Sequence, residues 1–211
     1  MYVVTGGAGF IGSNIAAAIE ERGLGKVIIC DKLRDGDKWR NVAKRELTDI
    51  IHPDDLFDYL GGNEYGIQGI INMGAISSTT GTDADLIFTS NFRLSLDLWN
   101  WCTVHHVPMI YASSAATYGD GANGFVDDSS LDALAKLRPL NPYGWSKQLF
   151  DRRVMRMLDD GEPKPPQWAG LKFFNVYGPN EYHKGSMQSV PSKAFTDASA
   201  GLTATLFKSH H

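Results

Sequence analysis

Cysteine is scarce in this sequence, and long hydrophobic runs are absent. The two cysteines among its 211 residues, Cys30 and Cys102, stand far apart in apolar surroundings. This pattern predicts buried, reduced thiols in a cytoplasmic protein rather than a disulfide or a metal site. No apolar run approaches the roughly 20 residues that a membrane-spanning helix needs. Glycines at positions 6, 7 and 9 interrupt the segment in which a signal peptide would be apolar, so we expect no membrane partner.

The sequence also lacks a tract rich in Lys and Arg. It has 20 basic and 24 acidic residues, which gives a net charge of −4. Proteins that bind nucleic acid normally carry a basic patch or stripe, so we expect no nucleic-acid partner. With 43% hydrophobic residues and 22 glycines, the remaining composition is that of an ordinary globular protein with one sizeable core.

Short apolar segments alternate with segments of helical periodicity along most of the chain. This alternation predicts an α/β fold of the Rossmann type, with a doubly wound parallel sheet and helices on both faces. The predicted strands cover residues 2–4, 27–30, 69–73, 108–112 and 171–174, with a weaker one at 41–47. The predicted helices cover residues 13–22, 54–60, 85–102 and 141–158. In the helix at 54–60 we expect Leu56, Phe57 and Leu60 to face the core.

Two stretches interrupt this pattern. Residues 119–139 are polar and rich in turn formers, which predicts a surface excursion, and the proline-rich residues 161–166 predict a stiff connection. We expect residues 1–175 to form a dinucleotide-binding domain. Residues 176–211 would then be the incomplete beginning of a small substrate-binding domain.

A glycine-rich turn joins the first predicted strand to the first predicted helix. Gly6, Gly9 and Gly12 have the spacing G-x-x-G-x-x-G. A dinucleotide pyrophosphate needs a tight turn, backbone without Cβ atoms where the phosphates approach, and the free N–H groups of a helix N-terminus. The spacing and its position between strand and helix therefore predict nucleotide binding.

An acidic residue, Asp31, ends the next predicted strand, at the distance at which NAD-binding proteins place a carboxylate for the adenosine ribose. Lys32, Arg34 and Lys38 follow it and could instead pair with the 2′-phosphate of NADP. These charges favour NADP modestly, and NAD stays possible.

A Tyr-x-x-x-Lys pair, Tyr143 and Lys147, begins the last long helix. Asn141 is a good N-cap and Pro142 a good first helical residue, so the tyrosine is predicted in the first turn. A spacing of four puts both side chains on one face of the helix. A nearby ammonium and the helix N-terminus would both lower the pKa of the phenol, which helps it act as a base.

A hydroxyl at the end of the predicted strand at 108–112 completes this pattern. Ser114 lies in the small-residue run Ser113–Gly119, and ligands of open parallel sheets bind beyond the carboxyl ends of the strands. Its hydroxyl could bond a substrate alcohol and the ketone that forms from it. We expect no metal ligands in this site.

Longer segments carry a resemblance to a known family. They are residues 76–80, 111–119, 174–179 and 183–187. In these segments the chain resembles the extended short-chain dehydrogenases/reductases, the NAD-dependent epimerase/dehydratase family. Within that family it is most similar to the ADP-heptose 6-epimerases, for which the run His-Lys-Gly-Ser-Met at 183–187 is distinctive.

The resemblance implies an isomerase that inverts C6 of ADP-D-glycero-D-manno-heptose, through a transient 6-keto form, with NADP bound. Such an enzyme supplies nucleotide sugar for the lipopolysaccharide core, and the family is usually a homo-oligomer, commonly a pentamer. By similarity, Tyr143 and Lys184 would each act as the base for one epimer. Ser114 would bond the reacting oxygen, and Lys147 would hold the nicotinamide ribose.

The resemblance also implies further contacts, in addition to the glycines and charged residues already named. Those with the cofactor would come from Phe10, Ile11, Met73, Gly74, Ala75, Ile76, Ser77, Ser90, Val176 and Lys184. Those with the sugar nucleotide would come from Asn175, Ser186, Lys193, Phe207, Lys208, Ser209 and His210, together with Ser114.

The chain departs from the family at several positions. Asn72-Met73 stand where many members have His-Glu, Pro53 stands where some have a lysine, and Ser90 aligns with an asparagine, although Asn91 is adjacent. The family continues for about a hundred further residues, so this chain is expected to be a truncated product or part of a longer one.

Three other functions are compatible with the shared motifs. A UDP-hexose 4-epimerase is the nearest of these, and the segment around Lys184 argues against it. A dehydratase would need an acidic pair where Ala115-Ala116 stand. A truncated, non-catalytic NAD(P)-binding module is compatible with the length of the chain.

Overall fold

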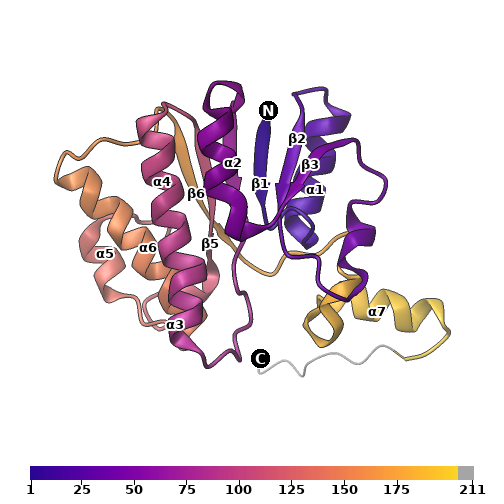
Figure 1. Ribbon diagram of the computed structural model, residues 1–211. Helices are drawn as coiled ribbons and strands as arrows, with labels where there is room; N and C mark the ends of the chain where they lie inside the picture. The colour runs from indigo at the N-terminus through magenta and orange to yellow at the C-terminus, as the bar shows by residue number, and fades with distance from the viewer. Residues whose placement is uncertain (204–211) are drawn as a thin grey trace.

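A six-stranded parallel sheet forms the centre of the molecule in the computed structural model, which describes residues 1–203 (Figure 1). The strand order is β3-β2-β1-β4-β5-β6, and every neighbouring pair is parallel. From β1 the strands are added outward on one side as far as β3, and from β4 on the other side as far as β6. The order therefore switches between β1 and β4, which is the point where open α/β sheets bind their ligands. The predicted Rossmann-type fold is therefore confirmed. The strands are β1 (Tyr2–Thr5), β2 (Val27–Cys30), β3 (Leu47–Ile51), β4 (Gly69–Asn72), β5 (Met109–Ser114) and β6 (Trp168–Phe173).

Helices follow the strands in alternation. The α-helices are α1 (Phe10–Glu21), α2 (Leu56–Asn63), α3 (Ala84–Ile87), α4 (Leu94–Val104), α5 (Leu131–Lys136), α6 (Pro142–Asp159) and α7 (Val190–Ser199). A π-helical segment, Phe88–Arg93, joins α3 to α4. Short 3₁₀ helices lie at Asp37–Asn41, Pro53–Asp55, Glu64–Gly66, Ala115–Tyr118 and Tyr182–Met187.

The two faces of the sheet bury separate cores. On one face, α2, α4 and α6 pack against the strands and bury side chains such as Leu60, Trp99 and Phe150. On the other face, α1 packs over β1 and β2 and buries Ala16 and Ile19. All of β2 is buried, as expected for a strand covered on both faces.

Both cysteines lie in the larger core as free, buried thiols. Burial raises the pKa of Cys30 and of Cys102 to about 12, so both thiols stay protonated at neutral pH. The prediction of buried, reduced cysteines is confirmed. Within the described residues, no helix has both the length and the apolar character that crossing a bilayer requires.

The face of β5 that points away from α6 carries apolar side chains that stay exposed. Ile110 alternates with the buried Met109 and Tyr111, so it points to the opposite face. On the neighbouring strand, Leu171 is paired with Ala112 and is also exposed. In the part of the chain described here, α1 therefore covers this face over β1 and β2, and the apolar side chains of β5 and β6 on the same face stay exposed.

The predicted strand at 41–47 is wrong, except for its last residue. Residues 37–41 form a 3₁₀ helix, and the strand begins only at Leu47. Between them, Arg45 pairs with Glu20 and Glu21 of α1, which holds this stretch at the surface. The apolar pair at 42–43 suggested a strand from too short a segment.

Two further predictions need correction. In α2, Leu56 and Leu60 are completely buried, but Phe57 is 38% exposed. Leu56 and Leu60 are four positions apart and share one face of the helix, whereas Phe57 is only one position from Leu56 and therefore points in another direction around the helix axis. The predicted surface excursion at 119–139 contains α5, whose start is capped when the Ser130 hydroxyl accepts a hydrogen bond from Ala133 N–H. Leu134 anchors that helix in a small separate core.

Candidate active site

The carboxyl ends of four strands deliver most of the predicted site residues to one edge of the sheet (Figure 1). The glycine turn follows β1, Asp31 follows β2, residues 73–77 follow β4, and Ser114 ends β5. Because these strands are parallel, their ends lie at the same edge, as the switch-point rule for ligand sites requires.

The glycine turn is as tight as its sequence predicted. Gly6 has a left-handed φ of 62°, and a Cβ added there would lie 2.8 Å from the Gly74 backbone. A Cβ on Gly12 would lie 2.2 Å from the Gly6 carbonyl oxygen. No side chain caps the start of α1, so the N–H groups of its first turn, at Phe10, Ile11 and Gly12, remain available to an anion. This cradle fits the pyrophosphate of a dinucleotide.

Asp31 is buried and binds the turn directly. One carboxylate oxygen accepts a hydrogen bond from Ala8 N–H at 2.9 Å, and the other accepts one from Lys32 N–H at 2.7 Å. The same carboxylate forms an ion pair with Lys38. The Lys32 ammonium lies 3.4 Å from Asp54 instead. Lys38 therefore compensates the charge of Asp31 at the position where the adenosine ribose of a dinucleotide would lie.

An asparagine braces the loop after β4, which contains Met73, Gly74, Ala75, Ile76 and Ser77. Asn91 is 1% exposed, and its side chain accepts from Ile76 N–H at 2.8 Å and donates to Ile76 O at 3.1 Å. It also donates to the Ser146 hydroxyl on α6. Ser90, the predicted contact, is its half-buried neighbour in the π-helical segment. This role was not predicted, although Asn91 stands next to the position that the resemblance singled out.

Asn72, which stands where many members of the resembling family have histidine, also has a structural role that this resemblance did not suggest. Its side chain accepts a hydrogen bond from the Thr5 hydroxyl at 2.6 Å and donates to Ser95 on α4 at 2.9 Å. The Thr5 hydroxyl in turn accepts from Gly74 N–H. This network connects β1, β4 and α4 beneath the glycine turn.

Tyr143 and Ser114 are brought together at the end of β5. The Asn141 side chain accepts from Gly144 N–H at 2.8 Å and Pro142 opens the helix, so the predicted N-cap of α6 is confirmed. Tyr143 lies in the first turn beside Ser114, which acts to lower the pKa of its phenol. One turn later, the Lys147 ammonium donates to Ala112 O at 2.8 Å.

Burial controls the pKa values of this pair of helical residues. Burial raises the pKa of Tyr143, and the hydrogen bond with Ser114 opposes that change. Burial also lowers the pKa of Lys147 to about 8, while the charge of Asp151 opposes it. The prediction of a lowered phenol pKa is wrong here, because the Lys147 ammonium bonds to a carbonyl oxygen and the desolvation of the phenol is the larger effect.

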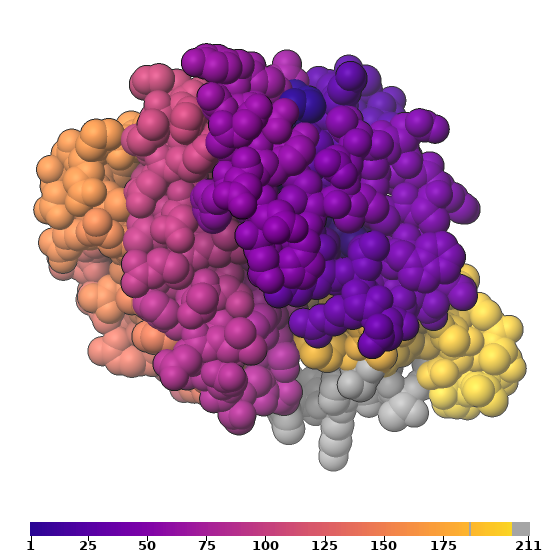
Figure 2. All heavy atoms as spheres, viewed as in Figure 1, coloured from indigo at the N-terminus to yellow at the C-terminus, as the bar shows by residue number. Residues whose placement is uncertain are grey.

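The segment at 178–189 lies against the start of α1. Asn180 donates to the Ser13 hydroxyl at 3.0 Å, and the Lys184 ammonium lies 5.2 Å from the centre of the Phe10 ring. Glu181, which is 1% exposed, accepts hydrogen bonds from Gly178 N–H and from Ser189. In Figure 2 the gold atoms of this C-terminal part lie against the purple atoms of the first part of the chain. The structure thus places Lys184 at the glycine turn.

The remaining predicted contacts are more scattered. Asn175 is exposed and Val176 half-buried after β6, Ser186 belongs to the 3₁₀ helix at 182–187, and Lys193 is an exposed residue of α7. The predicted contacts at Phe207, Lys208, Ser209 and His210 lie outside the described residues. Among residues 1–203, no group of three or more His, Cys, Asp or Glu side chains is arranged to hold a metal ion.

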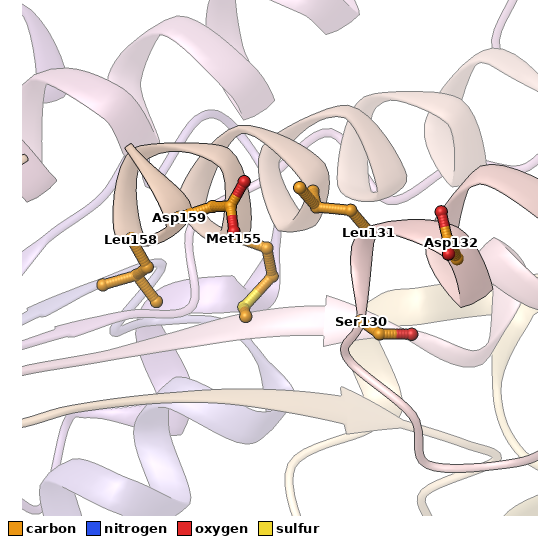
Figure 3. Close-up of a pocket in the computed structure, with 6 residues that line it drawn as sticks. All are labelled: Ser130, Leu131, Asp132, Met155, Leu158 and Asp159. Atoms are coloured by element: carbon orange, nitrogen blue, oxygen red, sulfur yellow. The ribbon is translucent and has the colours of Figure 1, made fainter. Parts of the chain in front are cut away.

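A surface hollow of about 530 Å³ lies away from these residues, between α5 and the end of α6 (Figure 3). Its walls come from Ser130, Leu131, Asp132, Met155, Leu158 and Asp159. Met155 is twelve positions after Tyr143 on one helix, which corresponds to about 18 Å along the axis. The hollow is therefore separate from the candidate site.

The chain is similar to a known family and to known proteins. The sequence matches the NAD dependent epimerase/dehydratase family over residues 2–210. The ADP-L-glycero-D-manno-heptose-6-epimerase of Fusobacterium nucleatum is 47% identical to it over the whole of this chain. The structure of the ADP-L-glycero-D-manno-heptose-6-epimerase of Helicobacter pylori matches 96% of this chain, with a TM-score of 0.77 and 28% identity.

A UDP-N-acetylglucosamine 4-epimerase from Methanobrevibacter ruminantium matches 99% of this chain and 65% of its own, with a TM-score of 0.75 and 24% identity, which shows a shared fold. The present chain spans 63% of the Fusobacterium protein and 64% of the Helicobacter chain.

Replacing Gly12 with alanine tests the turn as a phosphate site. The new Cβ would meet the Gly6 carbonyl oxygen, so the turn must open. We expect NADP affinity, measured by isothermal titration calorimetry, to fall about tenfold or more, which corresponds to ~1.4 kcal/mol. Gly61→Ala is the matched control, because a Cβ at that exposed position of α2 meets nothing within 4 Å. Unchanged affinity in Gly12→Ala would show that the phosphates bind elsewhere.

Proposed function

Because the chain belongs to the NAD dependent epimerase/dehydratase family, we propose that it is an isomerase of a nucleotide sugar with bound NADP. The substrate proposed is ADP-D-glycero-D-manno-heptose, and the reaction inverts C6 to give the L-glycero epimer. The observation that carries the proposal is the Ser114–Tyr143 pair at the end of β5, beside a glycine turn that fits a pyrophosphate. The similarity of the whole chain to heptose epimerases supports the choice of substrate.

The residues around the turn would hold the dinucleotide. The first N–H groups of α1 would bind the pyrophosphate, Lys38 and Asp31 would lie at the adenosine ribose, and Lys147 would bond the nicotinamide ribose. The loop at 73–77, braced by Asn91, would pack along the dinucleotide. When bound, an oxidised nicotinamide would supply an acceptor for hydride from C6 and, once reduced, a hydride donor for the return step.

The side chains of this chain would move the proton that accompanies that transfer. Tyr143, once ionised to the phenolate, would take the proton of the C6 hydroxyl as the carbon becomes a ketone, while the Ser114 hydroxyl bonds the same oxygen. Inversion requires hydrogen to return to the opposite face of C6, so the oxygen then needs a proton from another direction. Lys184 is the second group proposed for that role, and each of the two residues would serve one epimer.

The product would serve the lipopolysaccharide core, and the active protein would be a homo-oligomer. Both proposals are supported by the family resemblance. Residues 1–175 would form the dinucleotide-binding domain, and residues 176–211 would begin the part that binds the sugar.

Two observations favour specific alternatives. The glycine turn, Ser114 and the Tyr-Lys pair would serve a UDP-hexose 4-epimerase equally well, and a 4-epimerase shares the fold. The glycine turn by itself would also serve a non-catalytic NAD(P)-binding module.

A direct assay separates these functions. The purified chain, saturated with NADP, is incubated with ADP-D-glycero-D-manno-heptose, and the configuration at C6 is followed by NMR. Inversion at C6 supports the proposal. Full occupancy by NADP without inversion would support the binding module, and inversion of UDP-glucose at C4 in its place would support the 4-epimerase.

Replacing Tyr143 with phenylalanine removes the phenolic oxygen and keeps the ring. We expect epimerisation to fall by about 10²–10⁴-fold, the usual contribution of general acid–base catalysis, while NADP remains bound. Tyr65→Phe is the matched control, because Tyr65 is 99% exposed and lies after α2. Turnover near that of the unmodified protein in Tyr143→Phe would remove the phenol from the mechanism.

Replacing Lys38 with alanine tests which dinucleotide the site prefers. The variant loses the cation beside Asp31, so we expect NADP affinity to fall about tenfold more than NAD affinity. Both dissociation constants are measured by calorimetry. Lys44→Ala removes the charge of a nearby exposed lysine and controls for net charge. Equal losses for NADP and NAD would show that the 2′-phosphate binds elsewhere.

A further inference from the structure

A buried ion pair lies behind the Ser114–Tyr143 pair, and the mechanism above does not use it. Asp151 on α6 and Lys172 on β6 are joined at 2.6 Å, with 8% and 17% of their side chains exposed. The same carboxylate oxygen of Asp151 accepts a hydrogen bond from the Ser113 hydroxyl at 2.6 Å. The Lys172 ammonium also donates to the Thr117 hydroxyl at 3.1 Å. The pair is therefore fully engaged at the end of β5.

Asp151 continues the helical face that carries the reacting groups. Tyr143, Lys147 and Asp151 are spaced by four residues, so they follow one another along one side of α6. Lys147 is 4% exposed, and the hydrogen bond that its ammonium makes goes to the neutral carbonyl of Ala112. A buried ammonium without a compensating anion tends to lose its proton.

A buried ion pair is by itself a weak source of stability. The cost of removing both charges from water commonly equals their attraction, and apolar side chains of the same size would often serve the fold as well. Here the pair lies one helical turn from an ammonium that the reaction needs. Its position indicates an electrostatic role.

We propose that Asp151 and Lys172 are positioning residues that set the charge of Lys147. Asp151 supplies the negative charge that keeps the buried ammonium protonated. Lys172 limits the effect of Asp151, because its own positive charge opposes that of Lys147. The consequence for catalysis rests on the proposed function, in which only a charged Lys147 would hold the ribose and assist Tyr143.

The surroundings of Lys147 agree with this assignment. Burial is the largest influence and lowers its pKa to about 8, and Asp151 acts in the opposite direction. Tyr143 on the same helix and Tyr111 on β5 both have raised pKa values, so neither phenol adds a negative charge at neutral pH. Asp151 is the charged group that acts on Lys147, and Lys172 is the ion-pair partner of Asp151. Lys147 is charged below about pH 8 and loses its proton above it.

Two matched substitutions test the proposal through Lys147 itself. Asp151→Asn removes the negative charge with little change of shape, and Lys172→Gln removes the positive charge but keeps a hydrogen-bond donor. Each protein carries ¹⁵N-labelled lysine, and the Lys147 signal, assigned by its loss in Lys147→Met, is titrated by NMR. At a fixed pH, we expect the ratio of charged to neutral Lys147 to fall about tenfold in Asp151→Asn and to rise in Lys172→Gln.

The opposite signs are the decisive result, because a merely structural role would not produce them. Shifts in the same direction, or none, would overturn the proposal. Ser113→Ala removes a hydrogen bond to Asp151 without changing charge, and a shift as large as that of Asp151→Asn would also overturn it. If Asp151→Asn does not fold, as judged by circular dichroism, Lys172→Gln decides alone, and an unchanged or smaller ratio contradicts the proposal.

The functional readout is separate from this titration. In a protein active in the C6 assay, the pH at which the rate falls on the alkaline side is expected to move in the same direction as the Lys147 titration. If the Lys147 signal shifts as expected but no epimerisation occurs in any variant, the proposed function fails and the electrostatic assignment stands.

Discussion

The close approach of backbone to backbone at the first turn is the constraint on which the rest of the site depends. Gly12 packs on the Gly6 carbonyl, and Gly6 packs on Gly74, with no room for a Cβ at either contact. This packing brings the start of α1 beside the loop after β4. Asp31, at the end of the neighbouring strand β2, completes the arrangement because its carboxylate accepts a hydrogen bond from Ala8 N–H. One set of contacts therefore brings the start of α1, the loop after β4 and Asp31 together at one edge of the sheet.

The reacting end of the site is controlled by burial more than by any single charge. Tyr143 is held by Ser114, and its pKa is raised by desolvation. Lys147 has the opposite response to the same cause, because burial disfavours the charged form of either group. Asp151 and Lys172 extend this polar cluster behind β5. The helix α6 thus connects Tyr143 at its start to a buried ion pair two turns later.

Much of the fold could be predicted because it depends on local patterns. The apolar segments of β1, β2 and β4, the glycine spacing and the Asn141-Pro142 helix start are all properties of short sequence windows. The segment at 41–47 was wrongly predicted as a strand, since Arg45 pairs with Glu20 and Glu21 of α1, about twenty positions earlier in the chain. The hydrogen bonds between Asn91 and Ile76 were also not predicted, because Asn91 lies in a π-helical segment and the spacing of residues in the sequence does not reveal such a segment.

By itself, the sequence determined the order of strands and helices, the tight glycine turn after β1 and the pairing of Tyr143 with Lys147 on one helical face. These features follow from residue spacing and backbone conformation, which act over a few neighbours. Only the tertiary structure decided that Lys184 lies beside Phe10, that the phenol pKa is raised, and that Asp151 meets Lys172. Burial and charge pairing depend on groups far apart in the chain, and no local pattern contains them.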